Sequence, residues 1–440
     1  MDPVGAKKRN PWVWVSVLYF GEGFPYTVVN LMSVVFLKDL GAGNELIGLT
    51  SFLYLPWVLK GLWGPVVDIY STRRRWILSM ELVCTALFFI LAASSFARNI
   101  LAISIAIFAF VALTSATHDI AIDGFYLDAL DKDAQALFVG VRTTTYKFAW
   151  LFGNGGLVYL AGSIAQSYLK GTNAQGVKLY EELRIGFLGS VNPVAFGWFS
   201  AFAASGLVFL LLYFFQLWYL PFPQATRSVL PEGERPNFLE AFKTYFTQRK
   251  IGWIVAYVLI FRLGDAFMLK MAPPFLMDAA TKGGLAISTQ EMGILNGTVG
   301  SIALLAGGIL GGVLIAKQGL RRWMWPTAIV QNSAIILYWL LAAYKPSLPW
   351  VYGVNAYEQL SYGLGVSAYT VFLMRTIRPE FKASHYAITT AFMAAGVLIP
   401  GVFSGFLQVR MGYEQYFLMS FLVAIPGLCT IPFLPLEEKS

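Results

Sequence analysis

Two aspartates lie four residues apart in a long apolar segment that begins near Ile100. The stretch 115–128 reads SATHDIAIDGFYLD and contains Asp119 and Asp123. Residues four apart share a helix face, so both carboxyl groups are expected on one stripe. A carboxylate at membrane depth costs about 2.5–3.5 kcal/mol or more, so the pair must face other helices or a wet cavity. It is either a structural pair satisfied by interhelical hydrogen bonds or part of a proton or solute path. We favour the path, with Asp119 and Asp123 as the proton-coupling residues.

Other charged residues also lie inside apolar segments, where they usually mark functional sites. Glu22 stands near the middle of the first segment, beside Gly21, Gly23 and Pro25, which are expected to loosen the helix around it. Neighbouring aromatic residues suit sugar rings, although ordinary packing explains each of them singly as well. The residues expected to bind a solute are Glu22, Tyr26, Lys60, Arg142, Lys147, Arg262, Asp265, Lys270 and Glu358.

Spacing gives three local expectations. Arg262 and Asp265 are three apart on a helix and are expected to pair. Pro273 and Pro274 are expected to break or kink the end of the same segment. Glu81 lies early in its segment, so it is expected to reach the membrane interface or to pair with nearby arginines.

The composition is that of a helical membrane protein. Apolar residues make up 57% of the chain and charged residues 13%, about half the charged fraction of a soluble protein. The charges fall mostly between apolar runs, so the net charge of +8 needs no nucleic-acid partner. Cys84 and Cys429 both lie in apolar runs, which argues against a disulfide framework.

The apolar runs form two groups separated by a polar, proline-containing connection. Each run is about long enough to cross a hydrocarbon core of roughly 30 Å, which predicts an all-α membrane protein with about twelve spans. The runs lie near 11–37, 44–67, 75–97, 99–127, 135–166, 193–220, 250–277, 287–316, 321–343, 348–374, 383–408 and 412–435. The predicted domains are a six-helix half at 1–220, a cytoplasmic linker at 221–249 and a second six-helix half at 250–440.

Loop charges predict the orientation. Loops on the side of the N-terminus hold more than twice as many Lys and Arg residues as loops on the opposite side. The positive-inside rule therefore places both termini in the cytoplasm. The longest loop on the outer side, 167–192, is either a short interfacial helix or a solvated loop, and we favour the loop.

A short pattern repeats at the end of the second span of each half. In each half a glycine, Gly64 or Gly312, is followed nine residues later by two arginines. Two related halves about a central site are what an alternating-access transporter requires. The first of these stretches resembles the loop between spans two and three of the major facilitator superfamily. That resemblance implies gating roles for Asp68, Arg73, Arg74, Arg321 and Arg322, although a simple positive-inside loop also explains the arginines.

Several motifs in register resemble those of AmpG-type muropeptide permeases and, in part, the related acetyl-coenzyme A transporters. They are GEGFPY, LPWVLKGLWGPVVD, SATHDIAID, FRLGDAFMLKMAPPF, EMGILNGTVGSIALLAGGILGGVLIAKQGL and YEQLSYGLGVSAYTVFLM. The resemblance implies a major facilitator fold and proton-driven uptake of anhydro-muropeptides across a bacterial inner membrane. It also implies functional positions at Asp119, Asp123, Lys147, Asp265 and Glu358.

The chain departs from the family pattern at a few positions that bear on the ligand. His118 stands where Gln is usual, Lys147 and Arg262 exchange the two basic residue types, and Gly297 follows Asn296 where Lys is common. These departures leave open another anionic solute, such as a different glycan fragment, an acyl-coenzyme A or a nucleotide-like compound.

Other classes of protein fit less well. There is no clustered nucleophile and base, and the two histidines lie in separate halves, which argues against an enzyme. A sensor would need a soluble output domain of adequate length, and the chain has none. We expect a monomer in the lipid bilayer whose partners are a small solute and protons, with no cofactor, metal or nucleic acid.

Overall fold

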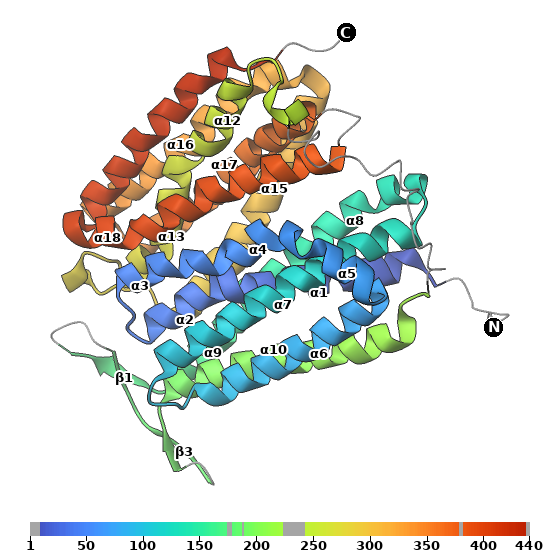
Figure 1. The fold of residues 1–440 in the computed structure, drawn as a ribbon. Coiled ribbons are helices and arrows are strands. Elements are labelled where there is room, and N and C mark those ends of the chain that lie inside the picture. Colours follow the sequence, from blue (N-terminus) through green and yellow to red (C-terminus); the bar gives the residue numbers. More distant parts are fainter. Residues whose placement is uncertain (1–8, 174–177, 187–188, 223–242, 378–381, 437–440) are drawn as a thin grey trace. The chain divides into compact units, whose positions relative to one another are not determined.

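A computed structural model describes residues 9–173, 178–186, 189–222, 243–377 and 382–436 of the chain (Figure 1). Within these residues, nine helical stretches are long and apolar enough to cross a membrane. Three more segments join them: α17, the broken stretch 44–70, and a second helix within α18, which is interrupted at Gly412 where φ is 75°. The predicted all-α architecture with about twelve spans is therefore confirmed.

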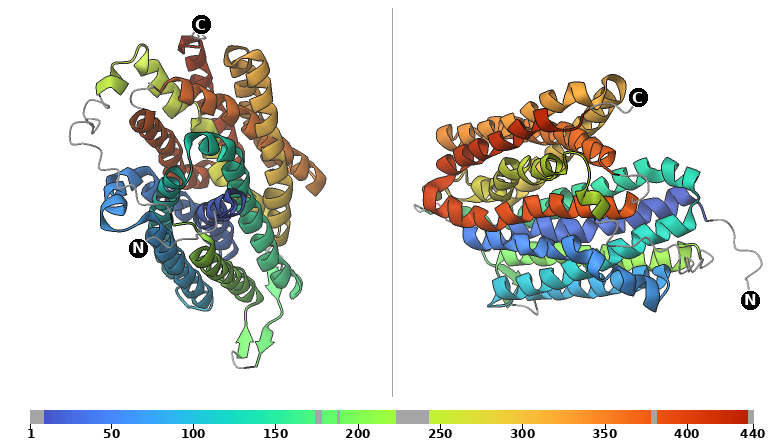
Figure 2. Two further views of the ribbon diagram at one scale, coloured as in Figure 1. Left: turned by 90° about the vertical axis from the view of Figure 1, so that its right-hand side faces the viewer. Right: turned by 45° about the horizontal axis from the view of Figure 1, so that its top comes forward.

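Among the described residues, the first structural unit comprises 9–36, 59–173, 178–186 and 189–222. Its helix α1 packs against α7 and α8, α6 packs against α7 and α10, and α9 packs against α10 (Figure 2). Its elements are α1 Pro11–Thr27, η1 Val28–Met32, η3 Lys60–Leu62, α5 Gly64–Tyr70, α6 Arg73–Ser94, α7 Ile100–Ala129, α8 Lys132–Trp150, η4 Leu151–Leu157, α9 Val158–Gln166, β1 Leu169–Thr172, β2 Lys178–Tyr180, β3 Leu183–Ile185, β4 Gly189–Val191 and α10 Pro193–Tyr219.

Among the described residues, the second unit comprises 37–58, 243–377 and 382–436. Its helix α17 packs against α15 and α16, and α18 packs against α3, α12, α13 and α16. Its elements are α3 Asn44–Leu49, η2 Thr50–Tyr54, α12 Ile251–Ile260, α13 Leu263–Met277, η5 Ala280–Lys282, α14 Thr289–Met292, η6 Gly293–Gly300, α15 Ser301–Gln318, α16 Leu320–Tyr344, α17 Leu348–Arg375, α18 Lys382–Thr430 and η8 Ile431–Phe433; α2 Ser33–Asp39 and α4 Leu55–Leu59 lie at the boundaries between the units.

The segment 37–58 belongs by sequence to the predicted first half, yet it packs with the second unit. Small residues allow this close approach, since a Cβ built on Gly48 would lie 2.9 Å from the backbone nitrogen of Gly405 in α18. The halves predicted at 1–220 and 250–440 therefore differ from the observed units in this segment. Much of the predicted 221–249 linker lies outside the described residues.

Expectations about the backbone were wrong in three places: around Glu22, at the predicted proline break, and in the region 167–192. The helix around Glu22 stays α-helical to Thr27, and the irregular π-helical turn η1 follows it. Helix α13 is not broken at Pro273 and Pro274, and the break falls instead at Arg262, between α12 and α13; a kink at the prolines stays a prediction. The 167–192 region is neither helical nor a plain loop, because it contains two antiparallel strand pairs, β1–β2 and β3–β4.

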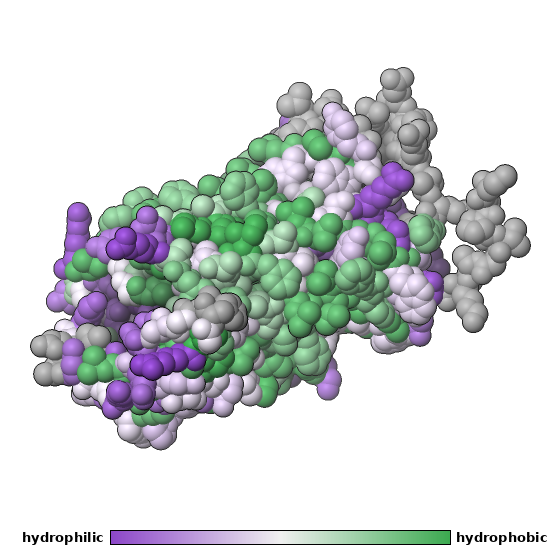
Figure 3. Space-filling model, turned by 90° about the horizontal axis from the view of Figure 1, so that it is seen from below, coloured by the Kyte–Doolittle hydropathy of each residue, from purple (hydrophilic) through white to green (hydrophobic). Residues whose placement is uncertain are grey.

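Apolar side chains cover the middle of the molecular face shown in Figure 3, and hydrophilic residues gather toward its ends. Large exposed apolar residues include Leu211 and Phe214 of α10 and Ile309 of α15, whose side chains are 60%, 57% and 68% exposed. Patches of this kind on a soluble protein would promote association. On a membrane protein they are the lipid-facing surface.

Candidate functional site

A cluster of carboxyl groups lies between α1 and α7 of the first unit. Lys60, from the short turn η3, forms an ion pair with Asp119 of α7. Glu22 of α1 is 9% exposed, its Oε2 atom is buried without a hydrogen-bond partner among the described residues, and its carboxyl group is near enough to that of Asp119 for the two to interact electrostatically. Two neighbouring carboxyl groups favour a proton on one of them, because a nearby like charge disfavours ionisation. The three residues form what we call the Glu22 cluster: Glu22, Lys60 and Asp119.

Asp123, one helical turn further along α7, has different partners. Its Oδ1 atom accepts hydrogen bonds from the Tyr19 hydroxyl and from Arg142 Nη2, each over 3.1 Å. The Arg142 guanidinium also lies 4.6 Å from the ring centroid of Tyr19 and 5.4 Å from that of Tyr126. The carboxyl groups of Asp119 and Asp123 thus have separate basic partners, although the two residues share one helix.

Lys147 of α8 lies in an aromatic environment. Its Nζ atom is 3.5 Å from the ring centroid of Trp150, and Tyr26 stacks on Trp150 with ring centroids 6.1 Å apart. The Tyr146 ring is also near Tyr26, at 6.2 Å. No carboxylate of the described residues lies within ion-pair distance of Lys147. Sequence reasoning missed Tyr146 and Trp150, although their positions one before and three after Lys147 were a usable signal.

The second unit contains its own buried charges. Arg262 pairs with Asp265 at 3.4 Å, as predicted, and donates a hydrogen bond to the Tyr362 hydroxyl over 2.7 Å. Glu358 of α17 is 2% exposed and accepts a hydrogen bond from Gln359 over 2.8 Å. These contacts pair Arg262 with Asp265 locally, although Arg262 Nε is buried without a hydrogen-bond partner among the described residues. Any role for the two residues in solute binding stays a prediction.

Lys270 of α13 and the segment 37–58 are in direct contact. The Lys270 ammonium donates a hydrogen bond to Thr50 Oγ1 over 2.9 Å. No carboxylate of the described residues lies within ion-pair distance of Lys270. A buried ammonium with only a hydroxyl partner has capacity for an anionic ligand, but solute binding by Lys270 also stays a prediction.

A polar network that the sequence did not indicate ties the segment 37–58 to α13 and α18. Lys38 forms an ion pair with Asp278 at 2.6 Å, and their side chains are 5% and 9% exposed. Asn44 Nδ2 lies 3.2 Å from Asp278, 2.6 Å from Gln408 and 2.8 Å from Tyr413. We call these five residues the Lys38 network.

The residues expected to act in gating differ from one another in their contacts and exposure. Arg73 forms an ion pair with Asp128 at 2.5 Å and donates to the Gly124 carbonyl over 2.9 Å. Arg74 donates to the Leu217 carbonyl over 2.6 Å. The side chain of Asp68 lies outside the described part of the structure. Arg321 and Arg322 are exposed at the start of α16.

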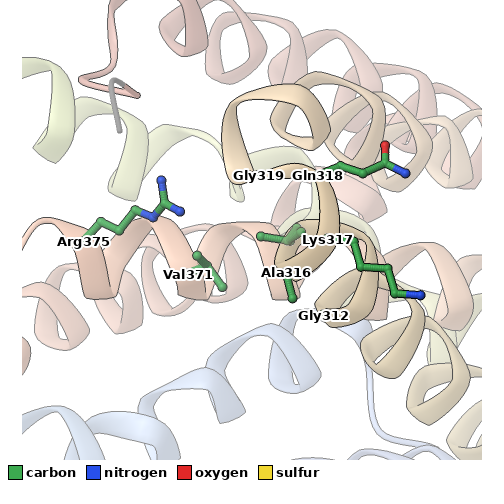
Figure 4. Close-up of a pocket in the computed structure, with 8 residues that line it drawn as sticks. Gly312, Ala316, Lys317, Gln318, Gly319, Val371 and Arg375 are labelled. Carbon is green, nitrogen blue, oxygen red and sulfur yellow. The ribbon is translucent and has the colours of Figure 1, made fainter. Parts of the chain in front are cut away.

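A surface cavity of about 560 Å³ lies at the ends of α15 and α17. Lys317 and Arg375 line it, together with Gly312, Ile315, Ala316 and Val371. The two basic side chains extend in different directions (Figure 4). The cavity therefore lacks convergent groups that would hold an anion.

Comparison with known proteins places this geometry in a family. The family model described as Major Facilitator Superfamily matches residues 15–400. The chain belongs to this superfamily. As a superfamily member, it is a multi-pass membrane protein of a transporter family, as the motifs and the apolar segments predicted.

Relatives of this superfamily member support the AmpG-type resemblance. The anhydromuropeptide permease of Escherichia coli K12 is 24% identical over 421 residues, covering 94% of this chain and 77% of the relative. A Rickettsia conorii protein described as putative transporter AmpG 4 is 21% identical and covers 96% of this chain and 95% of its own. The predicted resemblance is therefore confirmed.

Solved structures show the same fold. A bacterial homologue of the human lysosomal transporter Spinster superposes with a TM-score of 0.70 at 15% identity, over 98% of this chain and 97% of that one. A D-xylose-proton symporter gives a TM-score of 0.66 at 12% identity, over 97% of each chain. At such identities the likeness establishes the major facilitator fold and nothing finer.

Proposed function

We propose that this superfamily member is a proton-coupled importer of anhydro-muropeptides or closely related amino-sugar fragments in a bacterial inner membrane, with both termini in the cytoplasm. The observation that carries the proton coupling is the proximity of the buried carboxyl groups of Glu22 and Asp119. A nearby like charge favours a proton on one of the two groups, and Lys60 also pairs with Asp119, so the binding of a solute and the binding of a proton can affect one another at this cluster. The solute class is taken from the named relative and from the chemistry around Lys147.

Lys147 and its aromatic neighbours fit the proposed solute. A muropeptide carries carboxylates and sugar rings; the ammonium attracts the first, and aromatic faces stack on the second. Tyr26, Tyr146 and Trp150 provide such faces around Lys147. A cation held against a Trp ring gains about 0.5–2 kcal/mol, less than a hydrogen bond to a carboxylate gives in a dry site, so a solute carboxylate is able to compete for it.

The test of the function is uptake into liposomes. Purified protein is reconstituted, and labelled anhydro-muropeptide is supplied with and without an inward proton gradient. Accumulation above the external concentration only with the gradient supports the proposal. Equal flux in both conditions contradicts the coupling, and absence of flux with every muropeptide contradicts the solute class.

Replacing Lys147 by glutamine tests the solute contact. We expect Lys147→Gln to weaken binding of the anionic muropeptide by on the order of 10- to 100-fold, because a charge-assisted hydrogen bond is worth about 1.5–3 kcal/mol. Lys147→Arg keeps the charge and is the matched control. Binding is measured by calorimetry with the muropeptide and with its amidated, uncharged analogue. An equal loss for both ligands would show that Lys147 acts on the fold and not on the solute carboxylate.

A further inference from the structure

A second buried polar cluster lies behind the Glu22 cluster, on the side of α7 that faces α6 and α10. Glu81 of α6 and His118 of α7 are both fully buried, with 0% of each residue exposed. Glu81 Oε1 accepts a hydrogen bond from Gln216 Nε2 of α10 over 2.5 Å and lies 3.8 Å from His118 Nε2. The expectation that Glu81 reaches the membrane interface was therefore wrong.

Polar atoms in this cluster lack protein partners. Glu81 Oε2, Gln216 Oε1 and both ring nitrogens of His118 are buried without a hydrogen bond to any described residue. Such groups are costly to bury unless they share a proton or a bridging water. Glu81 Oε1 and His118 Nε2 are 3.8 Å apart. A small side-chain movement would bring them within hydrogen-bonding distance, and a water molecule could bridge them.

The surroundings of Glu81 offer few other charges. From α7 it faces His118, from α10 it faces the uncharged Gln216, and on its own helix the Cys84 thiol is near. Helix α1 presents Gly21, whose built Cβ would lie 3.5 Å from Glu81 Oε1. Tyr70 of α5 is 77% exposed and lies outside the cluster. An ionised Glu81 would thus have His118 as its one possible counterion among the described residues.

The Glu22 cluster and the pair formed by Glu81 and His118 are linked by residues that are neighbours along α1 and α7. His118 precedes Asp119 on α7, and the two side chains interact electrostatically. Gly21 precedes Glu22 on α1 and leaves space beside Glu81 and His118. A change of charge on Asp119 therefore changes the electrostatic potential at the His118 ring.

We propose that Glu81 is a buried, protonated carboxylic acid with His118 as its proton-exchange partner, and that the pair is a second proton-binding site coupled to the Glu22 cluster. The proton lies on the Glu81 carboxyl group, which faces His118 Nε2 at 3.8 Å, and Gln216 positions the acid by donating to Oε1. When His118 takes this proton, the products are a carboxylate and an imidazolium, so the net charge of the pair is unchanged. Only the role of the pair in transport rests on the proposed function; its protonation does not.

Infrared spectroscopy of the purified full-length protein tests the protonation directly. We expect Glu81→Gln to remove a carbonyl-stretch band of a protonated carboxylic acid from the wild-type spectrum, and His118→Gln to shift the frequency of that band. Cys84→Ser, on the same helix, is the matched control and should leave the band in place. The same band in Glu81→Gln as in the wild type would overturn the proposal. Glutamine is isosteric with a neutral acid, so we also expect an unchanged Tm; a large fall would indicate an ionised Glu81 and would likewise overturn it.

Transport by the same variants tests the coupling. In proteoliposomes, we expect Glu81→Gln and His118→Gln to lower gradient-driven muropeptide accumulation by at least about tenfold, while exchange of labelled for unlabelled solute continues. Normal accumulation by both variants would overturn the coupling role. If wild-type protein shows no dependence on the proton gradient, the proposed function fails, and the infrared result still decides whether the pair holds a proton.

Discussion

Asp119→Asn is expected to abolish concentrative uptake while leaving the protein in the membrane. The asparagine amide cannot take up a proton, and it leaves Lys60 without its carboxylate and Glu22 without the neighbouring carboxyl group. Because the Lys60 side chain is 35% exposed, water partly compensates it. We therefore expect a loss of about 1–3 kcal/mol in unfolding free energy, together with the loss of accumulation in the liposome assay.

A double variant separates the structural effect from the transport effect. In Lys60→Met with Asp119→Asn, no unpaired ammonium remains, so stability should return toward the wild-type value. Accumulation should stay absent, because the proton-binding group is still missing. Asp131→Asn is the matched control, since Asp131 is exposed and its side chain caps α8, a role that asparagine also fills.

The outcome that contradicts this assignment is concrete. If Asp119→Asn accumulates muropeptide as the wild type does, then Asp119 does not carry the transported proton. If the double variant regains accumulation along with stability, the aspartate serves only to neutralise Lys60. Proton uptake would then have to be assigned to another group.

Local patterns in the sequence predicted much of the architecture. The length of an apolar run and the charge of a loop are properties of consecutive residues. The spans could therefore be predicted without knowing which helices pack together. The ion pair of Arg262 and Asp265 was predictable for the same reason, because three residues on a helix set its geometry.

The partners of the deep charges were not predictable in this way. Lys60 and Asp119 are 59 residues apart, and Glu81 and Gln216 are 135 apart. Such pairings depend on which helices pack together, a property that hydropathy and spacing do not carry. Glu81 illustrates the error: its position near a span end suggested the interface, but α10 supplies a buried amide partner.

Helix irregularities were also misplaced by local reasoning. Pro273 and Pro274 were expected to break or kink α13, but the helix continues through both prolines and ends at Met277. The break at Arg262 has no proline or glycine at its centre. Instead, Arg262 is held there by Asp265 and Tyr362, and these contacts are tertiary as well as local.

Asp278→Asn is expected to weaken the docking of the segment 37–58 onto α13 and α18. The Lys38 ammonium would lose its carboxylate at a site where both side chains are less than one tenth exposed, at 5% and 9%. Breaking one partner of such a buried pair costs about 3–5 kcal/mol. The lower value alone corresponds to an increase on the order of 100-fold in the undocked fraction.

Labelling of an introduced cysteine measures this undocking. Ser51 is 9% exposed in the docked segment, so Ser51→Cys should react slowly with a maleimide in an otherwise wild-type protein and much faster with Asp278→Asn. Leu49→Cys, at a position 37% exposed on the same segment, is the matched control and should label equally in both backgrounds. Cys429 is exposed and is replaced by serine in every variant, and Cys84 is buried.

Exchange of the two charges decides whether the ion pair itself is responsible. Lys38→Asp with Asp278→Lys restores opposite charges, so we expect slow labelling at Ser51→Cys to return in part. The remaining difference reflects Asn44 and Tyr413, which are placed to contact a carboxylate at position 278. Equally fast labelling in the exchanged variant and in Asp278→Asn would assign the docking to the close approach at Gly48 and Gly405 instead. The Lys38 network would then follow the docking of the segment and would not control it.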